Sequence, residues 1–326
     1  MPRKIDVHHH YFPHDLNKKV ASAAVGFRTP PEHLPWTPQV SLNAMDALGV
    51  DLAILSVPAN YAAAGAGSRE KACAANEAMA AVCVAHPGRF AFWACLGDWR
   101  DVDDALDIIV HALDELKAVG VAVSSCYGTG PEAKYIGDEM FGRIWSELDR
   151  RAAIVFLHGA QMPAATPMPH PALGIPITEA PHETFKAIAH LIVSGTTTRH
   201  RRVTLILAHM GGSTLALAHR VAALSAYMGA PLTEEGILDE FRRCWWDCAL
   251  SGTTEAAQAF GVGKQVVWGS DFPAVPLDAI RWFDVQLEDG FPKGERERLE
   301  GISYANILDL FSSHDILLGQ PTSTEA

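Results

Sequence analysis

Short apolar runs alternate with longer amphipathic stretches along the whole of this 326-residue chain. The short runs are almost continuously apolar, as parallel strands covered on both faces require. The longer stretches, such as 101–119, repeat apolar residues at three- and four-residue intervals, which is typical of helices. The candidate strands are Lys4–His10, Leu52–Pro58, Arg89–Leu96, Gly120–Ser125, Ala153–His158, Val203–His209, Cys244–Leu250 and Gln265–Asp271.

Eight strands with intervening helices predict an α/β fold of the (β/α)8 TIM-barrel type. An open doubly wound sheet is the alternative, but no Gly-rich phosphate-binding turn follows the first strand. We expect one domain over residues 1–326, because such barrels reach this length as a single unit. Two insertions, at about residues 13–39 and 161–181, follow the first and fifth strands and are predicted to act as lids.

The charge and cysteine content limit the classes of partner. The formal net charge is −12 and no basic stripe is present, which argues against nucleic acid and anionic membrane surfaces. No apolar stretch approaches the roughly 20 residues of a membrane span. The six cysteines form no CxxC pair and are predicted to be free thiols. With no signal-peptide pattern at the start of the sequence, we expect a cytoplasmic protein.

The strongest local signal is the segment Asp6-Val7-His8-His9-His10. Side chains alternate along a strand, so His8 and His10 are expected on one face and His9 on the other. A His-rich N-terminus can also be the remnant of a purification tag. These three histidines lie within a strand-like run, however, which favours a pair of metal ligands.

Three further residues each close an apolar run: His158, His209 and Asp271. They are expected at the C-terminal ends of barrel strands, the face that carries the active site in this fold. His8, His10, His158 and Asp271 together offer three nitrogens and one oxygen. This set predicts one divalent metal ion, with Zn²⁺ as the first expectation and Mn²⁺ as the alternative. His209 is left as an uncoordinated imidazole for general acid–base catalysis.

These motifs resemble the amidohydrolase superfamily. More narrowly, the chain is similar to its non-oxidative decarboxylases, which include aminocarboxymuconate-semialdehyde, resorcylate and 6-methylsalicylate decarboxylases. The resemblance implies that His8, His10, His158 and Asp271 bind the metal and that His209 is catalytic. The likeness covers nearly the whole chain in the same motif order. It is carried by segments 5–10, 45–50, 135–138, 145–148, 181–184, 208–212 and 269–273.

The resemblance also implies a homodimer. Arg220 lies eleven positions after His209, where similar decarboxylases place an arginine that reaches the neighbouring subunit's site. The alternative is an ordinary solvated helix residue.

Two differences from related families limit the expected metal content and substrate. The fourth strand, Gly120–Ser125, lacks the lysine of the binuclear branch, so a second metal is not expected. Ser41 and Asn43 occur where muconate-semialdehyde decarboxylases carry arginines, so a dicarboxylate would lack a clamp.

The resulting hypothesis is decarboxylation of an ortho-hydroxy aromatic acid of the salicylate type, with 6-methylsalicylate as the preferred candidate. Asp271 would protonate the ring carbon with help from His209, and the substrate's ring would rest against Tyr11 and Phe12.

A metal-dependent hydrolase of a lactone or amide is the alternative, because it needs the same ion and imidazole. A non-catalytic metal-binding protein is disfavoured by the predicted lids. Asp247 is interpreted either as support for the metal site or as a structural residue.

Overall fold

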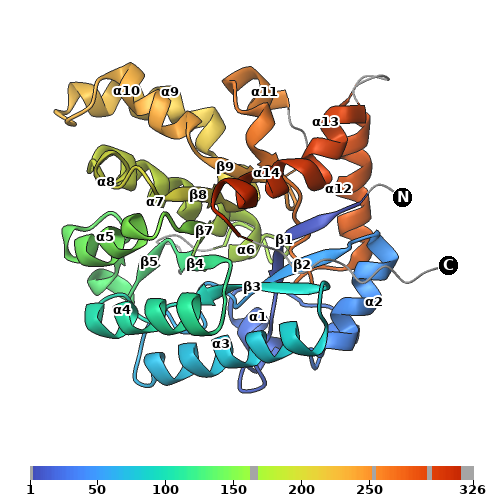
Figure 1. The fold of residues 1–326 in the computed structure, drawn as a ribbon. Helices are drawn as coiled ribbons and strands as arrows, with labels where there is room; N and C mark the ends of the chain where they lie inside the picture. The colour runs from blue at the N-terminus through green and yellow to red at the C-terminus, as the bar shows by residue number, and fades with distance from the viewer. Residues whose placement is uncertain (1–2, 162–167, 252–254, 292–295, 317–326) are drawn as a thin grey trace.

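The computed structural model describes residues 3–161, 168–251, 255–291 and 296–316. Eight parallel strands form one sheet, in the order β1-β2-β3-β4-β7-β8-β9-β10. Figure 1 shows them at the centre of the molecule with the helices around them. The strands are β1 (Ile5–His10), β2 (Leu52–Ser56), β3 (Phe90–Cys95), β4 (Gly120–Ser124), β7 (Ile154–His158), β8 (Thr204–Leu207), β9 (Trp245–Asp247) and β10 (Val266–Val267). A separate hairpin pairs β5 (Cys126–Tyr127) with β6 (Lys134–Tyr135).

The two ends of the eight-stranded sheet meet through backbone hydrogen bonds between β1 and the segment that follows β10. The Val7 amide donates to the carbonyl of Trp268 at 3.1 Å, and the His10 amide donates to the carbonyl of Phe272 at 2.6 Å. The Asp271 amide donates to the carbonyl of His8 at 2.8 Å. The sheet is therefore a nearly closed barrel, and the predicted (β/α)8 fold is confirmed.

The helices follow the strands as the apolar periodicity predicts. Helix α2 illustrates the local signals, because the Thr37 side chain caps its first turn and Gly49 ends it in the left-handed region. None of the helices in the described part of the chain combines the length and apolar character that a membrane span requires. The helices are α1 (Lys18–Ala24), α2 (Pro38–Leu48), α3 (Ser68–Ala85), α4 (Val102–Val110), α5 (Gly142–Arg150), α6 (Ile175–Thr178), α7 (Ala180–Val193), α8 (Thr196–Arg199), α9 (Thr214–Tyr227), α10 (Glu234–Arg242), α11 (Glu255–Phe260), α12 (Leu277–Asp289), α13 (Arg296–Glu300) and α14 (Asn306–Ser313).

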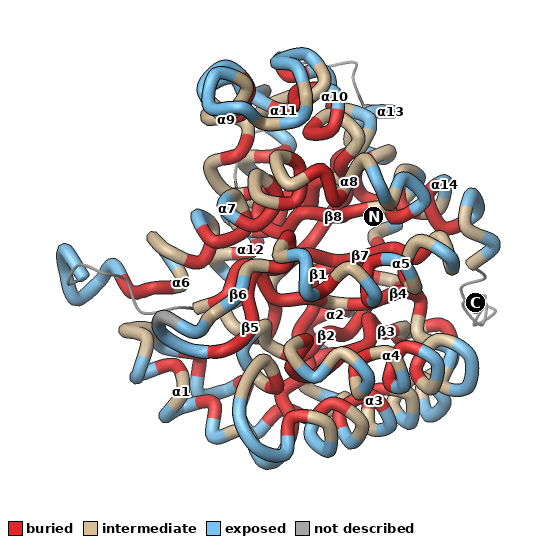
Figure 2. Tube along the Cα trace, turned by 90° about the vertical axis from the view of Figure 1, so that its left-hand side faces the viewer, coloured by how far each residue is buried: buried red, intermediate tan, exposed pale blue. Residues whose placement is uncertain are grey.

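The interior of the barrel is a packed apolar core. Figure 2 shows the strands around it as buried along most of their length. Helix α14 covers one end of this core and contributes Ile307, Leu310 and Phe311 to it. The Phe311 ring lies 6.1 Å from the ring of Trp93 on β3. Since α14 covers that end, the functional groups are found at the other end, where the strands terminate.

Strand β1 contains an irregularity that changes which side chains face the barrel interior. Ile5 and Val7 both belong to the inner apolar cluster. The pairing with β2 then shifts between Asp6 and His9, so that β1 has one more residue than its partner over this stretch. This bulge brings His8 inward directly after Val7. The His8 ring accordingly lies 5.0 Å from the inner Phe156 ring.

The two insertions meet above the C-terminal ends of the strands. The first contains α1 and a short 3-10 turn, Pro31–His33, and the described part of the second contains α6. The Ile175 amide donates to the carbonyl of Val25 at 3.0 Å, which joins the second insertion to the first. Residues 162–167 of the second insertion lie outside the described part of the chain.

The six cysteines are all free, as predicted. Cys95, Cys126, Cys244 and Cys248 are buried. Burial raises the pKa of the Cys244 thiol to about 12, which makes it an unreactive core residue.

Candidate metal centre and active site

Four histidines and one aspartate converge where the barrel strands end. His8 and His10 come from β1, and His158 is the last residue of β7. His209 follows β8, and Asp271 follows β10. Their potential ligand atoms form two triads, His8–His158–His209 and His8–His10–Asp271, and within each triad the atoms lie no more than 4.8 Å apart. His8 belongs to both triads, so the five side chains form one cluster.

Three of the imidazoles are oriented by backbone carbonyls. A carbonyl oxygen can only accept a hydrogen bond, so the Nδ1 atom that contacts it must carry the proton. The Nε2 atom then has a free lone pair, which is the state needed to bind a metal or accept a proton. The three pairs are His10 with Ser56 (3.3 Å), His158 with Gly159 (2.9 Å) and His209 with Ala249 (3.0 Å).

His8 is oriented by a carboxylate instead. Its Nδ1 atom hydrogen-bonds to Asp247 at 3.0 Å, and both side chains are fully buried. Burial by itself would lower the pKa of His8, but the charge and hydrogen bond of Asp247 raise it to about 9. The Nε2 atom of His8 is buried and has no hydrogen-bond partner; the nearest oxygen of Asp271 is 3.6 Å away. A buried polar atom without a partner is costly, and a cation between His8 and Asp271 would remove that cost.

The contact between His10 and Asp271 points to the same requirement. The Nε2 atom of His10 lies 3.0 Å from Oδ1 of Asp271. A hydrogen bond there needs a proton on Nε2, although Nδ1 already donates to the Ser56 carbonyl and burial lowers the pKa of His10. Burial would raise the pKa of Asp271, but the hydrogen bond from His10 and the nearby imidazoles hold it far below its usual range. An anionic carboxylate facing two imidazole nitrogens fits a divalent cation.

The backbone at two of these residues adopts a conformation that non-glycine residues rarely use. His209 and Met210 have φ values of 55° and 53°, and Asp271 has a φ of 61°. Such left-handed residues are held in place by their surroundings and are concentrated at functional sites. Gly212, with a φ of 61°, closes this turn, and a Cβ atom there would overlap the carbonyl of Pro181.

Asp6 holds the first strand against the segment that follows the last one. Its Oδ1 atom accepts from the amides of His8 (3.1 Å) and Ser270 (3.0 Å), and its Oδ2 atom contacts the Nδ1 atom of His9 at 2.9 Å. The Nε2 atom of His9 contacts the Ser41 hydroxyl at 2.8 Å. His9 thus faces away from the cluster, as the strand alternation predicts, and Ser41 serves this outer contact.

A cavity of about 640 Å³ opens above the cluster. Its polar base contains His10, His158, His209 and Asp271. Its walls are mostly apolar and come largely from the two insertions and from the segment that follows β10. They include Val25, Phe27, Pro176, Ile177, Ala180, Pro181, Ala274, Val275, Pro276 and Phe283. This shape and lining suit a small aromatic molecule with one polar end.

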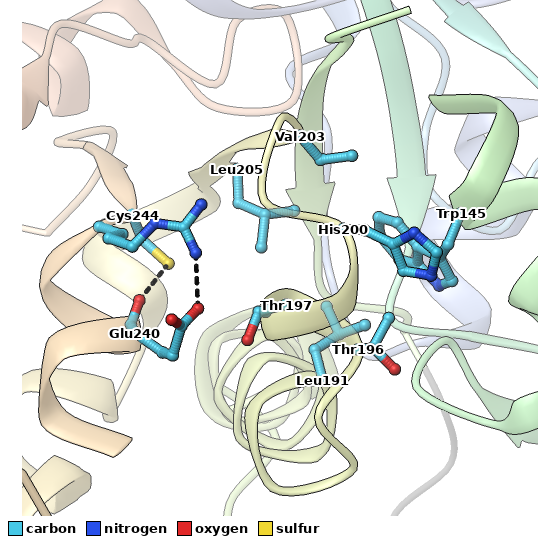
Figure 3. Close-up of a pocket in the computed structure, with 10 residues that line it drawn as sticks. Trp145, Leu191, Thr196, Thr197, His200, Val203, Leu205, Glu240 and Cys244 are labelled. Atoms are coloured by element: carbon cyan, nitrogen blue, oxygen red, sulfur yellow. Dashed lines mark hydrogen bonds and ion pairs between the residues drawn. The ribbon is translucent and has the colours of Figure 1, made fainter. Parts of the chain in front are cut away.

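A second hollow lies near the N-terminal ends of β8 and β9, beside Val203 and Cys244, and is shown in Figure 3. Its volume is about 20 Å³, which is room for roughly one water molecule. Glu240 lies beside it and forms an ion pair with Arg243 at 2.7 Å. The hollow is therefore too small to serve as the substrate site.

Three predicted substrate-binding residues lie away from the larger cavity's lining. Tyr11 is buried against Trp36, with ring centroids 4.8 Å apart. Phe12 stacks on His10 at 6.4 Å and lines a neighbouring cavity of about 540 Å³. Arg220 is exposed on α9. Contact of these residues with substrate stays a prediction.

Sequence reasoning did not single out two polar residues of the cavity wall, Lys18 and Asn60. Asn60 exchanges two hydrogen bonds with the backbone of Gln161, at 3.0 and 3.2 Å, and so joins the loop after β2 to the loop after β7. Neither residue belongs to a motif. Their positions depend on how the loops pack, which local sequence patterns do not reveal.

Comparison with known families matches residues 5–307 to the family described as amidohydrolase. The chain belongs to the amidohydrolase family. Among curated members, the 6-methylsalicylic acid decarboxylase of Aspergillus aculeatus is 36% identical over 304 residues, covering 88% of this chain and 89% of that protein. The 6-methylsalicylic acid decarboxylase of Penicillium expansum is 33% identical over 298 residues, covering 87% and 89%.

Solved structures of decarboxylases share the fold of this chain. A 2,6-dihydroxybenzoate decarboxylase complexed with 2,6-dihydroxybenzoate aligns with a TM-score of 0.78 and 22% identity, over 96% of this chain and all of the other. A dihydroxybenzoic acid decarboxylase from Polaromonas, with bound manganese and the inhibitor 2-nitroresorcinol, aligns with a TM-score of 0.79 and 21% identity, over 96% and 97%. At these identities the likeness establishes the barrel fold.

Proposed function

We propose that this amidohydrolase is a carbon–carbon lyase that decarboxylates an ortho-hydroxy aromatic acid to a phenol and carbon dioxide. The preferred candidate substrate is 6-methylsalicylate, and the product would then be 3-methylphenol. The observation that carries the proposal is the cavity itself, in which His10, His158, His209 and Asp271 form the polar base and apolar side chains form the walls. The curated decarboxylases at 33–36% identity support the same reaction class.

His8, His10, His158 and Asp271 would hold one divalent ion, with Zn²⁺ as our first candidate and Mn²⁺ as the alternative. The buried Nε2 atom of His8, which has no partner, supports this assignment. When bound, the ion would supply positive charge that stabilises negative charge on the substrate's phenolic oxygen.

Asp271 is proposed to deliver a proton to the ring carbon that bears the carboxylate. The bond from that carbon to the carboxylate then breaks, carbon dioxide leaves, and the bonding electron pair restores the aromatic ring. His209 would act as the proton relay to Asp271, because its Nδ1 atom is fixed by the Ala249 carbonyl and its Nε2 atom lies in the cluster. Apolar walls that include Phe27 and Phe283 would hold the ring and exclude water.

We further propose a cytoplasmic homodimer in which Arg220 reaches the partner's site. Helix α9 and the residue after it support this proposal, because they carry large exposed apolar side chains beyond Arg220. Leu224 is 48% exposed, Tyr227 is 85% exposed and Met228 is 79% exposed. Apolar side chains gathered on one exposed helix are typical of a protein–protein contact.

The deciding experiment measures carbon dioxide release from a panel of ortho-hydroxybenzoic acids, including 6-methylsalicylate. It compares the metal-loaded protein with the chelator-treated protein and with the His158→Ala variant. Gas and the matching phenol from the loaded wild-type protein alone are expected. Equal activity after chelation would contradict the metal requirement. If the metal-loaded protein turned over none of the acids, decarboxylation would be excluded for them, and lactones and amides would be tested for hydrolysis.

A further inference from the structure

Lys18 is the only lysine or arginine among the described residues that line the active-site cavity. It is the first residue of α1, in the insertion that follows β1. The only carboxylate among those lining residues is Asp271, which belongs to the cluster at the base. The remaining polar groups of the lining, such as Asn60 and Gln161, are neutral. An acid that enters this cavity therefore meets one side-chain ammonium.

The ammonium of Lys18 has no hydrogen bond or ion pair within the described part of the chain, although the residue is only 9% exposed. Its Nζ atom lies 4.8 Å from the centre of the Phe12 ring, whose face is the nearest favourable contact. Burial lowers the pKa of Lys18, and the negative charge of Asp271 opposes that effect. An ammonium confined to a largely apolar cavity is costly without an anionic partner, so an anion supplied from outside the chain would stabilise this arrangement.

We infer that the ammonium of Lys18 pairs with the acidic head group of the substrate and thereby selects acids that carry one negative charge. This inference rests on the proposed decarboxylase function and names the residue that recognises the acid. A lysine provides a compact point charge that pairs with one carboxylate. A dicarboxylate substrate would need a second cation, such as a bidentate arginine, for its other carboxylate. The described residues of the lining include no second lysine or arginine, and the proposed divalent ion would already face the phenolic oxygen. The second carboxylate of a dicarboxylate would therefore lack a partner.

The test compares Lys18→Met, which removes the charge and keeps an unbranched side chain one atom shorter, with Lys18→Arg, which keeps the charge. Lys19→Met is the matched control, because Lys19 is exposed and does not line this cavity. Two ligands that cannot be decarboxylated are titrated into each metal-loaded protein by calorimetry: the anion 2-methylbenzoate and the neutral phenol 3-methylphenol. The KM and kcat for 6-methylsalicylate are measured on the same preparations.

Lys18→Met is expected to weaken 2-methylbenzoate binding and to raise KM by about tenfold or more, while 3-methylphenol binding stays within about twofold of the wild type. Lys18→Arg is expected to recover part of the affinity for the anion, and Lys19→Met to behave as the wild type. Metal content and thermal unfolding are measured for every variant, so that a misfolded protein is recognised. If Lys18→Met is misfolded, the affinity of Lys18→Arg for the anion decides whether the inference holds.

Equal weakening of the anion and the neutral phenol in Lys18→Met would overturn the inference, because it would indicate a packing role. Unchanged affinity for the anion, or no binding of the anion by the wild type, would overturn it as well. A different result would contradict the proposed function alone: the wild type would bind 2-methylbenzoate through Lys18 but release carbon dioxide from none of the acids.

Discussion

Nδ1 of His8 donates a hydrogen bond to Oδ2 of Asp247 over 3.0 Å, between two side chains that solvent does not reach. This contact turns the Nε2 atom of His8 toward the cluster, where it is shared by both triads of potential ligand atoms. The carboxylate also increases the basicity of the imidazole, which strengthens it as a ligand. Asp247 would therefore support the proposed metal site without itself belonging to either triad.

Replacing Asp247 with Asn is expected to lower the affinity for the divalent ion by about 10–100-fold, because the amide cannot hold His8 as a charged acceptor does. Chelator competition with Zn²⁺ measures this affinity. Activity should return when the ion is supplied in excess. Asp278→Asn is the control, since that side chain is 93% exposed on α12. An Asp247→Asn protein with wild-type affinity would show that the contact does not affect metal binding.

Replacing Gly212 with Ala is expected to destabilise the fold by about 3 kcal/mol, because the new methyl group overlaps the Pro181 carbonyl and the backbone has a positive φ. Gly229→Ala separates the two causes: Gly229 also has a positive φ, 91°, but a Cβ atom there meets nothing within 4 Å. We expect a loss of about 1 kcal/mol in that control. Urea unfolding of both variants measures the difference, and equal losses would rule out the overlap with Pro181.

The Glu147 carboxylate on α5 should stabilise the protein in a manner that depends on pH. It accepts hydrogen bonds from Arg150 (2.8 Å) and Arg151 (2.6 Å), and Arg151 also binds Asp114 at 2.6 Å. The hydrogen bonds from Arg150, followed by those from Arg151, lower the pKa of Glu147 from 4.5 to about 2. Because the folded-state pKa is the lower one, this stabilisation is complete above pH 4.5 and is lost as the pH falls toward 2.

The corresponding measurement is the free energy of unfolding of wild type and Glu147→Gln as a function of pH. Above pH 4.5 the variant is expected to be less stable by up to about 1 kcal/mol, and the gap should close as the pH falls below that value. A gap that is the same at every pH would mean that the charge of Glu147 does not contribute.

If Arg220 completes the partner's site, two inactive variants should restore activity when their subunits are exchanged. We expect Arg220→Ala and Asp271→Ala homodimers each to release little carbon dioxide. After mixing and exchange, half of the dimers contain one subunit of each kind, and each of these has one complete site, so about a quarter of wild-type activity should return. A monomer by light scattering, or no recovery after demonstrated exchange, would contradict the proposed dimer.

The arrangement of the barrel could be predicted from the sequence because each strand is an apolar run between helical segments. The last strand was predicted as Gln265–Asp271, but regular pairing with β9 covers only Val266–Val267. The residues that follow bond to β1 instead, through Trp268, Asp271 and Phe272. That closure depends on contacts between the two ends of the chain, which a local pattern does not contain.

In the candidate site, too, some residues could be predicted from the sequence and others could not. The clustering of His8, His10, His158, His209 and Asp271 follows from their positions at strand ends, which a barrel brings together. Lys18 and Asn60 could not be found in this way, because they reach the cavity through the folding of loops. Tyr11 and Phe12 follow His10 in sequence, yet neither lines the cavity: Tyr11 packs against Trp36, and Phe12 stacks on His10.

The one-residue bulge divides β1 into two halves with different structural roles. On one side of it, Ile5 and Val7 fill the barrel core, and on the other His8 and His10 join the cluster of potential metal ligands. Replacing Val7 with another apolar residue can therefore leave the orientation of the two imidazoles unchanged. Deleting one residue at the bulge would instead turn one half relative to the other, so the strand tolerates exchange of side chains far better than a change in its length.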